Sequence, residues 1–203
     1  MKTKVLGILL LLGSMGINAN AAKVSQFGAG IRGGTFGIPN ALLDLVFFEH
    51  PQLKGNSFAF EIHSYGNKGP QSVFSGIYSL EYSRMEGNGY FRNEQFNNRL
   101  FGSGEITQIS FTATILMHIF SSSPIHPYIG GGIGICRFSI FAEGSYMDEL
   151  GTTIHKTLDK KMFLPVGHIP IGIMGNIDNK FILRAEAGFK NGFYFGGSMV
   201  VNF

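Results

Sequence analysis

The chain has 203 residues, of which 44% are hydrophobic and only 14% are charged, with 29 glycines, 20 phenylalanines and one cysteine. Soluble domains carry about 25% charged residues, so this composition is poor in the groups that keep a protein surface hydrated. Intrinsic disorder is excluded too, because it requires few aromatic residues and a high net charge. These proportions indicate a β-rich protein with much of its exterior out of water.

The N-terminal segment has the parts of a secretory signal peptide. Lys2 and Lys4 precede an apolar run over residues 5–13, and small residues follow it. An uncleaved membrane anchor is the alternative, but the run is short for a membrane helix, which needs ~20 apolar residues. We therefore expect residues 1–21 to be a cleaved signal peptide and residues 22–203 to form one barrel domain.

Cleavage changes the charge balance of the protein. The full chain has 16 basic and 13 acidic residues; losing Lys2 and Lys4 leaves 14 against 13, a net charge of +1. A charge this small gives no electrostatic reason to expect a nucleic-acid partner. Cys136 is the only cysteine, so no intrachain disulfide is expected to hold the exported chain together.

Beyond residue 22, apolar and polar side chains alternate along several segments, which is the period of a β-strand. The clearest segment runs from Gln108 to Phe120, where every second side chain from Ile109 to Ile119 is apolar and those between are mostly polar. The alternation predicts eight strands, at residues 24–34, 57–66, 72–84, 105–119, 127–140, 164–176, 180–190 and 193–203.

The lengths of these strands and of their connections favour a membrane barrel over a soluble sandwich. A strand tilted across a bilayer needs about 9–11 residues. Long and short connections alternate along the chain, and Asn191-Gly192 is a two-residue hairpin signal. Lipid offers no hydrogen-bond partners, so a spanning sheet must close without a free edge. We expect an all-β fold: an eight-stranded antiparallel transmembrane β-barrel, an up-and-down meander with both mature termini in the periplasm.

Two segments of the chain resemble small outer-membrane β-barrels of the OmpA, OmpX and OmpW kind. They are the glycine-rich stretch at 127–134 and the C-terminal stretch at 193–203. In that group a terminal aromatic residue, with apolar residues at every second position before it, marks the last strand for barrel assembly. The resemblance implies that the barrel-assembly machinery reads the following residues here: Phe193, Phe195, Met199, Val201 and Phe203.

The strand register also predicts a lumen charge network. A buried charge must be paired, and the alternation turns the following ionisable side chains inward: Arg32, Glu61, His63, Glu81, His118, Arg184 and Glu186. One interpretation is a polar conduit for small solutes, and the other is a salt-bridged plug. The narrow lumen of an eight-stranded barrel favours the plug, in which Glu61 or Glu81 is a partner of Arg184.

No catalytic, cofactor-binding or metal site is predicted. A lipid A-modifying hydrolase or acyltransferase would need a histidine and a serine on one strand face with an acid nearby. The residues two positions after His63, His118 and His168 are Tyr65, Phe120 and Pro170, none of them a serine. The other three histidines, in predicted turns or loops, show no metal-ligand spacing: His50, His126 and His155.

Three long connections are predicted to be outer loops of the barrel. Residues 38–51 predict a short, largely apolar helix in the first outer loop, with Pro39 near its start and Pro51 beyond its end. It could lie in the lipid headgroups, fold over or into the barrel mouth as a lid, or bind a partner. The loops at 85–104 and 141–163 are polar and are expected to be solvated. A protein- or glycan-binding role is the alternative, because the first of them contains Tyr90, Phe91, Phe96 and Phe101.

The predicted function is that of an integral protein of the bacterial outer membrane with a structural or surface-interaction role. A narrow porin-like channel is the second hypothesis, and a lipid A-modifying enzyme is the third. The expected partners are outer-membrane lipid, the barrel-assembly machinery and an unidentified surface ligand.

Overall fold

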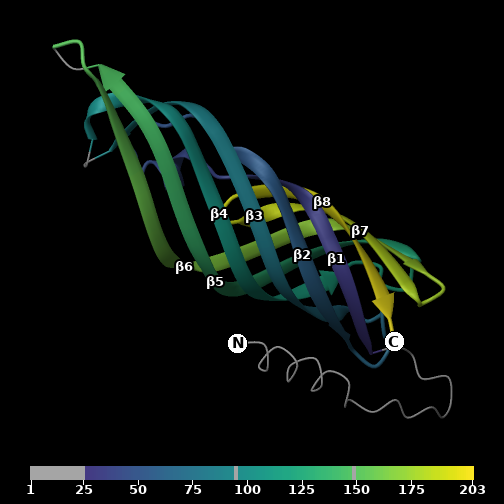
Figure 1. The fold of residues 1–203 in the computed structure, drawn as a ribbon. Coiled ribbons are helices and arrows are strands. Elements are labelled where there is room, and N and C mark those ends of the chain that lie inside the picture. Colours follow the sequence, from purple (N-terminus) through teal and green to yellow (C-terminus); the bar gives the residue numbers. More distant parts are fainter. Residues whose placement is uncertain (1–25, 94–95, 148–149) are drawn as a thin grey trace, which may run out of the picture.

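The computed structural model describes residues 26–93, 96–147 and 150–203 and shows a closed β-barrel (Figure 1). Each strand pairs antiparallel with the next, and β1 pairs with β8 to close the ring. The predicted eight-stranded up-and-down barrel is confirmed. The strands are β1 (Phe27–Gly37), β2 (Lys54–Tyr65), β3 (Phe74–Asn93), β4 (Phe96–His118), β5 (Ile125–Met147), β6 (Thr153–Ile177), β7 (Phe181–Lys190) and β8 (Phe193–Asn202).

The two faces of each strand follow the predicted alternation. On β4, the side chains of Gln108, Thr112 and His118 are buried in the lumen, whereas those of Ile109 and Ile115 are exposed on the outside. Because the side-chain period of a strand is two, one register fixes the inner and outer sets along the whole strand. The sequence pattern therefore placed the polar side chains inside and the apolar ones outside.

Four of the strands are much longer than the other four. β3 to β6 have 20 to 25 residues, and β1, β2, β7 and β8 have 10 to 12. The long strands continue past one end of the barrel (Figure 1) and form a four-stranded extension, here called the protruding sheet, of residues 87–93, 96–107, 139–147 and 153–161.

The expectation of loops at 85–104 and 141–163 is therefore wrong, although the outward-facing side chains there are exposed as expected. Most of these residues lie in strands, and register pairs run up to Asn93–Phe96 and Met147–Thr153. Their polar composition reflects the outward positions, whereas inward positions carry buried apolar side chains such as Met85, Phe91 and Leu158. A sheet with one apolar face is stable where something covers that face.

The cover is supplied by the connection between β1 and β2, residues 38–53, which we call the strap. Leu43, Phe47 and Leu53 of the strap are buried in one apolar cluster with Phe91 and Leu100 of the protruding sheet. The rings of Phe47 and Phe91 are 5.6 Å apart between centroids. Of the three interpretations of this segment, the structure supports a lid folded into the barrel mouth.

The strap contains much less helix than expected. The predicted helix over 38–51 is limited to a single turn, α2 (Asn40–Leu43). The segment then pairs with β3 through a bridge between Glu49 and Arg92, in which Arg92 N donates to Glu49 O at 3.0 Å. Arg99 of β4 also forms a hydrogen-bonded ion pair with Glu49. The hydrogen bond from Arg99 lowers the pKa of the Glu49 carboxyl. Tertiary packing of the apolar side chains overrides the helical tendency here.

The opposite end of the barrel carries the connections 66–73, 119–124 and 178–180, which we call the short turns, and both ends of the described chain. Phe203 N donates to Phe27 O at 2.9 Å, so the two ends lie together. Within the described ranges, no helix has the length and apolar character required to cross a membrane. The predicted signal peptide, residues 1–21, lies outside the described residues.

Adjacent phenylalanines of the strap test its role as a packed lid. Phe47 is 2% exposed and Phe48 is 66% exposed. Phe47→Ala should lower the free energy of unfolding by about 3–5 kcal/mol, because it removes a buried ring from a packed cluster. Phe48→Ala should change it by less than about 0.5 kcal/mol. Urea titrations in detergent micelles measure both, and equal small effects would show that the strap is not packed.

Candidate functional site

The centre of the lumen holds a layer of six charged side chains, which we call the charge layer. Glu61, Glu81 and Glu186 supply three negative charges, and three cations face them from two strands. All six are buried, and the cations are Arg32 of β1 with Arg184 and Lys190 of β7. With equal numbers of each sign, the layer is electrically balanced.

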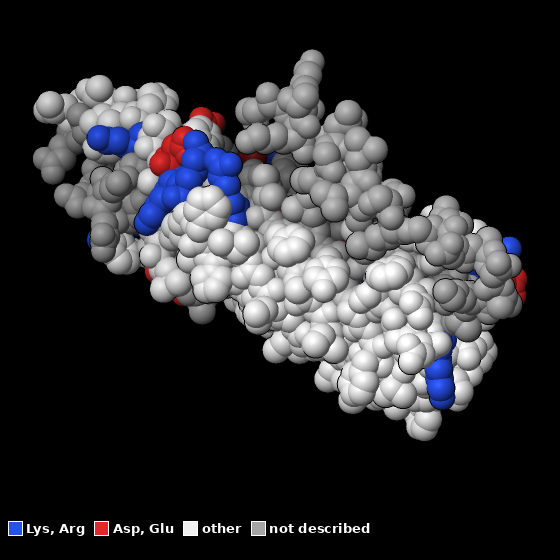
Figure 2. Space-filling view, turned by 90° about the horizontal axis from the view of Figure 1, so that it is seen from below, with Lys and Arg blue, Asp and Glu red and all other residues white. Residues whose placement is uncertain are grey.

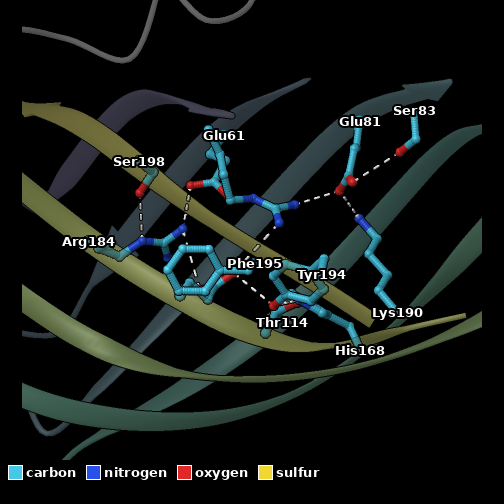
Figure 3. Close-up of polar contacts among 12 residues, drawn as sticks. Glu61, Glu81, Ser83, Thr114, His168, Arg184, Lys190, Tyr194, Phe195 and Ser198 are labelled. Atoms are coloured by element: carbon cyan, nitrogen blue, oxygen red, sulfur yellow. Dashed lines mark hydrogen bonds and ion pairs between the residues drawn. The ribbon is translucent and has the colours of Figure 1, made fainter. Parts of the chain in front are cut away.

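Arginine forks link the carboxylates of the charge layer. Arg32 donates from Nε to Glu61 Oε1 at 3.0 Å and from Nη2 to Glu81 Oε2 at 2.5 Å. Arg184 donates from Nη2 to Glu61 Oε2 at 2.7 Å, which places Glu61 between the two arginines (Figure 3). Lys190 Nζ donates to Glu81 Oε2 at 2.7 Å. A planar guanidinium can bridge two carboxylates in this way, whereas an ammonium is a point charge.

Glu186 is held by two tyrosines. Tyr128 Oη donates to its Oε2 at 2.6 Å and Tyr194 Oη donates to its Oε1 at 2.8 Å. His168 Nε2 lies 2.7 Å from Tyr194 Oη, and Thr114 Oγ1 lies 2.8 Å from His168 Nδ1. Because Tyr194 donates to the carboxylate, these contacts fit a chain in which Thr114 donates to Nδ1 and Nε2 donates to Tyr194.

Apolar layers lie on both sides of the charge layer. Toward the protruding sheet is the strap cluster, which includes Met85, Ile106 and Phe138. Toward the short turns is a second buried cluster of Tyr65, Ile77, Leu116, Tyr128, Met174, Ile182 and Val200. Apolar side chains at both ends exclude water, so the charges between them depend on one another.

The end of the lumen near the short turns holds a hydrogen-bonded relay of three side chains. Ser75 Oγ is 2.7 Å from His118 Nε2, and His126 Nε2 is 3.2 Å from His118 Nδ1. His126 Nδ1 lies 2.9 Å from Ser123 O and donates to it. All three side chains are buried, and the relay ties β3, β4 and β5 together.

The predicted lumen residues have the following places. Arg32, Glu61, Glu81, Arg184 and Glu186 meet in the charge layer, and the predicted contact between Arg184 and Glu61 is present. His63 lies beside it, with Nε2 3.2 Å from Glu61 Oε2. His118 belongs to the relay instead.

The sequence pattern did not predict the positions of several residues. Lys190 occupies an inward position at the end of β7, so following the alternation to Lys190 could have included it. Ser75 contacts His118 from the neighbouring strand, whereas the sequence test compared residues along one strand only. His126 and His155, expected in turns or loops, lie within β5 and β6. Such cross-strand pairs require the register, which a single strand pattern does not contain.

The remaining predicted sites concern the outer surface and metals. The five residues of the predicted assembly signal lie on the outer face at the end of the chain: Phe193, Phe195, Met199, Val201 and Phe203. Among the described residues, histidine, cysteine and acidic side chains form no group of three that could hold a metal ion.

Substitution of Arg184 tests whether the charge layer is dry. Arg184→Met leaves Glu61 without one partner, so the free energy of unfolding should fall by about 3–5 kcal/mol. In a hydrated channel the loss should be only about 0–1 kcal/mol. The exposed Arg92 of the protruding sheet provides the control, because Arg92→Met should change stability by less than about 0.5 kcal/mol.

A second substitution separates pairing from packing. Adding Glu61→Gln to Arg184→Met removes the stranded negative charge, so the double variant should show a favourable coupling of about 0.5–3 kcal/mol. Additive losses in urea titrations would contradict a paired, water-free layer.

The structure is similar to those of known outer-membrane barrels. Neisserial surface protein A (NspA) superposes with a TM-score of 0.52 and 13% identity, over 87% of this chain and 96% of that one. Ail, the attachment invasion locus protein of Yersinia pestis, solved with the heparin analogue sucrose octasulfate, has a TM-score of 0.47 and 13% identity over 88% and 99%. The N-terminal β-barrel domain of Pseudomonas aeruginosa OprF has a TM-score of 0.32 and 13% identity over 88% and 98%.

No protein-family model and no curated protein matches the sequence. The likeness to NspA extends over nearly the whole of both chains. The chain has the fold of the small eight-stranded outer-membrane β-barrels.

Proposed function

We propose that this protein is an integral protein of the bacterial outer membrane, in which a sealed barrel holds the protruding sheet at the cell surface for contact with other molecules. An apolar belt supports the membrane location. On β4 the exposed apolar residues run from Ile109 to Ile119, ten residues apart. At ~3.3 Å per residue and a tilt of ~40°, that stretch covers about 25 Å, the height of the apolar band of such barrels.

The belt has the same upper limit on neighbouring strands. At its edge Tyr82, Ile109 and Phe163 are exposed in one row, which also contains the exposed Arg137. The next row toward the protruding sheet holds Arg84, Thr107, Ser139 and Lys161. Figure 2 shows charged side chains gathered toward the two ends of one face, with a broad uncharged region between them. A belt bounded by polar rows is what lipid tails between two headgroup layers require.

The proposed orientation places the protruding sheet outside the cell. Outer-membrane barrels keep their chain termini on the periplasmic side, and here the two ends of the described chain lie opposite the protruding sheet. The same proposal includes export directed by residues 1–21 as a cleaved signal peptide. It also includes assembly of the barrel through the aromatic pattern at the C-terminus.

The filled lumen favours an anchor over a channel or an enzyme. The charge layer is buried between two apolar clusters, so a solute path would require both to move. A narrow channel and a lipid A-modifying enzyme therefore remain weaker hypotheses. The protruding sheet extends β3 to β6 beyond the length of the other four strands, and a function at the cell surface accounts for this extension.

The observation that carries the proposal is the edge of β6. β7 pairs with β6 from Ile177 only as far as His168, and in the described part of the chain no strand pairs with the other side of Thr153–Gly167. We propose that an extended segment of a partner protein adds to this edge by main-chain hydrogen bonds. Three lysines, Lys156, Lys160 and Lys161, lie along it against one acid, Asp159, so an acidic segment is the favoured partner.

The belt is tested by placing a charge in it. Ile115 is 65% exposed in the middle of the β4 stretch. Ile115→Arg should cost about 2–4 kcal/mol of folding free energy in bilayers, because it puts a cation among lipid tails. Phe141→Arg, on the protruding sheet, should cost less than about 1 kcal/mol. Equal tolerance of both in folding assays in lipid vesicles would contradict a membrane-facing wall.

The surface role is tested by reversing charge on the β6 edge. Escherichia coli displaying the protein should adhere to epithelial monolayers, and the double variant Lys160→Glu, Lys161→Glu should reduce adherence at least ~5-fold through repulsion of an acidic partner. Lys54→Glu, on β2, is the control and should leave adherence within about twofold. Unchanged adherence of the double variant at equal surface display would contradict the proposed edge contact.

A further inference from the structure

We infer that the outer face of the protruding sheet carries a binding site for one pyranose ring of an uncharged saccharide. The site is a hollow of about 290 Å³ across β4, β5 and β6. It is lined by Phe101, Ser103, Glu143, Gly144, Ser145, His155, Lys156 and Thr157. The inference rests on the proposed function only in requiring that the protruding sheet stand outside the membrane.

Two rows of residues in register build the hollow. Phe101 lies opposite Ser145, which lies opposite His155; Ser103 lies opposite Glu143, which lies opposite Thr157. Phe101 is eight residues beyond the belt edge at Ile109, which places it ~20 Å above the apolar belt. This height is well clear of the lipid tails, in the layer of surface sugars and solvent.

Phe101 supplies a fixed aromatic wall. It is 58% exposed, and its ring lies 5.1 Å from that of Tyr90 in an edge-on arrangement of 66°. The guanidinium carbon of Arg99 lies 4.0 Å from the centroid of the Tyr90 ring. An aromatic ring held in place by such neighbours presents a preformed apolar surface at little entropic cost.

The rest of the rim combines hydrogen-bond donors and acceptors. Ser103 Oγ donates to Glu143 Oε1 at 3.2 Å, which orients a carboxylate on the floor of the hollow. Ser145 and Thr157 supply hydroxyls, and His155 supplies a donor or an acceptor. Ligand sites commonly combine aromatic surface with a few convergent polar groups in this manner.

This combination selects a sugar over other ligands of the cell surface. A pyranose has an apolar face of C–H groups and a rim of hydroxyls that both donate and accept. An acyl chain would leave the polar rim unpaired, and a phosphate would be repelled by Glu143. The volume lies near the ~300 Å³ lower end of ligand pockets, so it suits one ring.

The test measures saccharide binding to the full protein folded in detergent micelles. Two probes are titrated by isothermal calorimetry: a dephosphorylated core oligosaccharide of lipopolysaccharide, and N-acetyllactosamine. Phe101→Ala should weaken binding of the responsive probe at least ~10-fold, and Glu143→Gln should weaken it at least ~5-fold. Phe141→Ala is the matched control, because Phe141 is also exposed on the outer face, and should stay within about twofold.

Each outcome has a definite meaning. Binding of the core oligosaccharide identifies the membrane's own glycolipid as the source, and binding of N-acetyllactosamine identifies a host glycan. The inference is overturned if the wild type binds neither probe. It is also overturned if Glu143→Gln and Phe101→Ala both bind the probe with the affinity of the wild type. Glu143→Gln preserves side-chain shape, so the test does not depend on the fold of Phe101→Ala.

The edge variant keeps this inference separate from the proposed function. The double variant Lys160→Glu, Lys161→Glu leaves the residues that line the hollow unchanged, and it should bind the saccharide within about twofold of wild type. Intact saccharide binding with unchanged adherence would contradict the β6-edge contact alone, whereas lost adherence without any saccharide binding would contradict this site alone.

Discussion

A closed ring of eight strands leaves a lumen just wide enough for side chains, and this limit governs the rest of the molecule. Every inward position must be filled without voids, and any inward charge loses most of its water. The chain meets both demands with Glu61, Glu81 and Glu186 set against Arg32, Arg184 and Lys190. The charges offset one another, so the centre of the barrel can be both polar and dry.

The apolar clusters on either side make that arrangement stable. Water that reached the charge layer would compete for Arg32 and Arg184 and weaken their bonds to Glu61. The strap supplies much of the outer seal, since Leu43, Phe47 and Leu53 pack on the inner face of the protruding sheet. The same packing supports the protruding sheet, which has no second barrel wall to face. A sealed lumen and a rigid surface element therefore depend on one set of contacts.

The sequence allowed the barrel to be predicted because alternation is a local signal. The inward placement of Glu61, Glu81 and Arg184 follows from it directly. The pattern left Glu61 and Glu81 as alternative partners of Arg184, and the structure pairs it with Glu61. The length of β3 to β6 was missed because their upper inward positions pack on the strap, a contact between distant parts of the chain. For the same reason residues 38–51 were predicted to form a helix. Their apolar side chains show that the segment must be buried, but they do not show which surface it packs against.

The most direct test of a sealed, charge-paired lumen is the current that the wild-type protein carries in a planar lipid bilayer. With single molecules inserted and ~100 mV applied across the membrane, the account predicts no unitary current above that of the bare bilayer. Stable unitary currents whose conductance changes in Glu81→Gln would contradict it, because ions would then be passing through the charge layer.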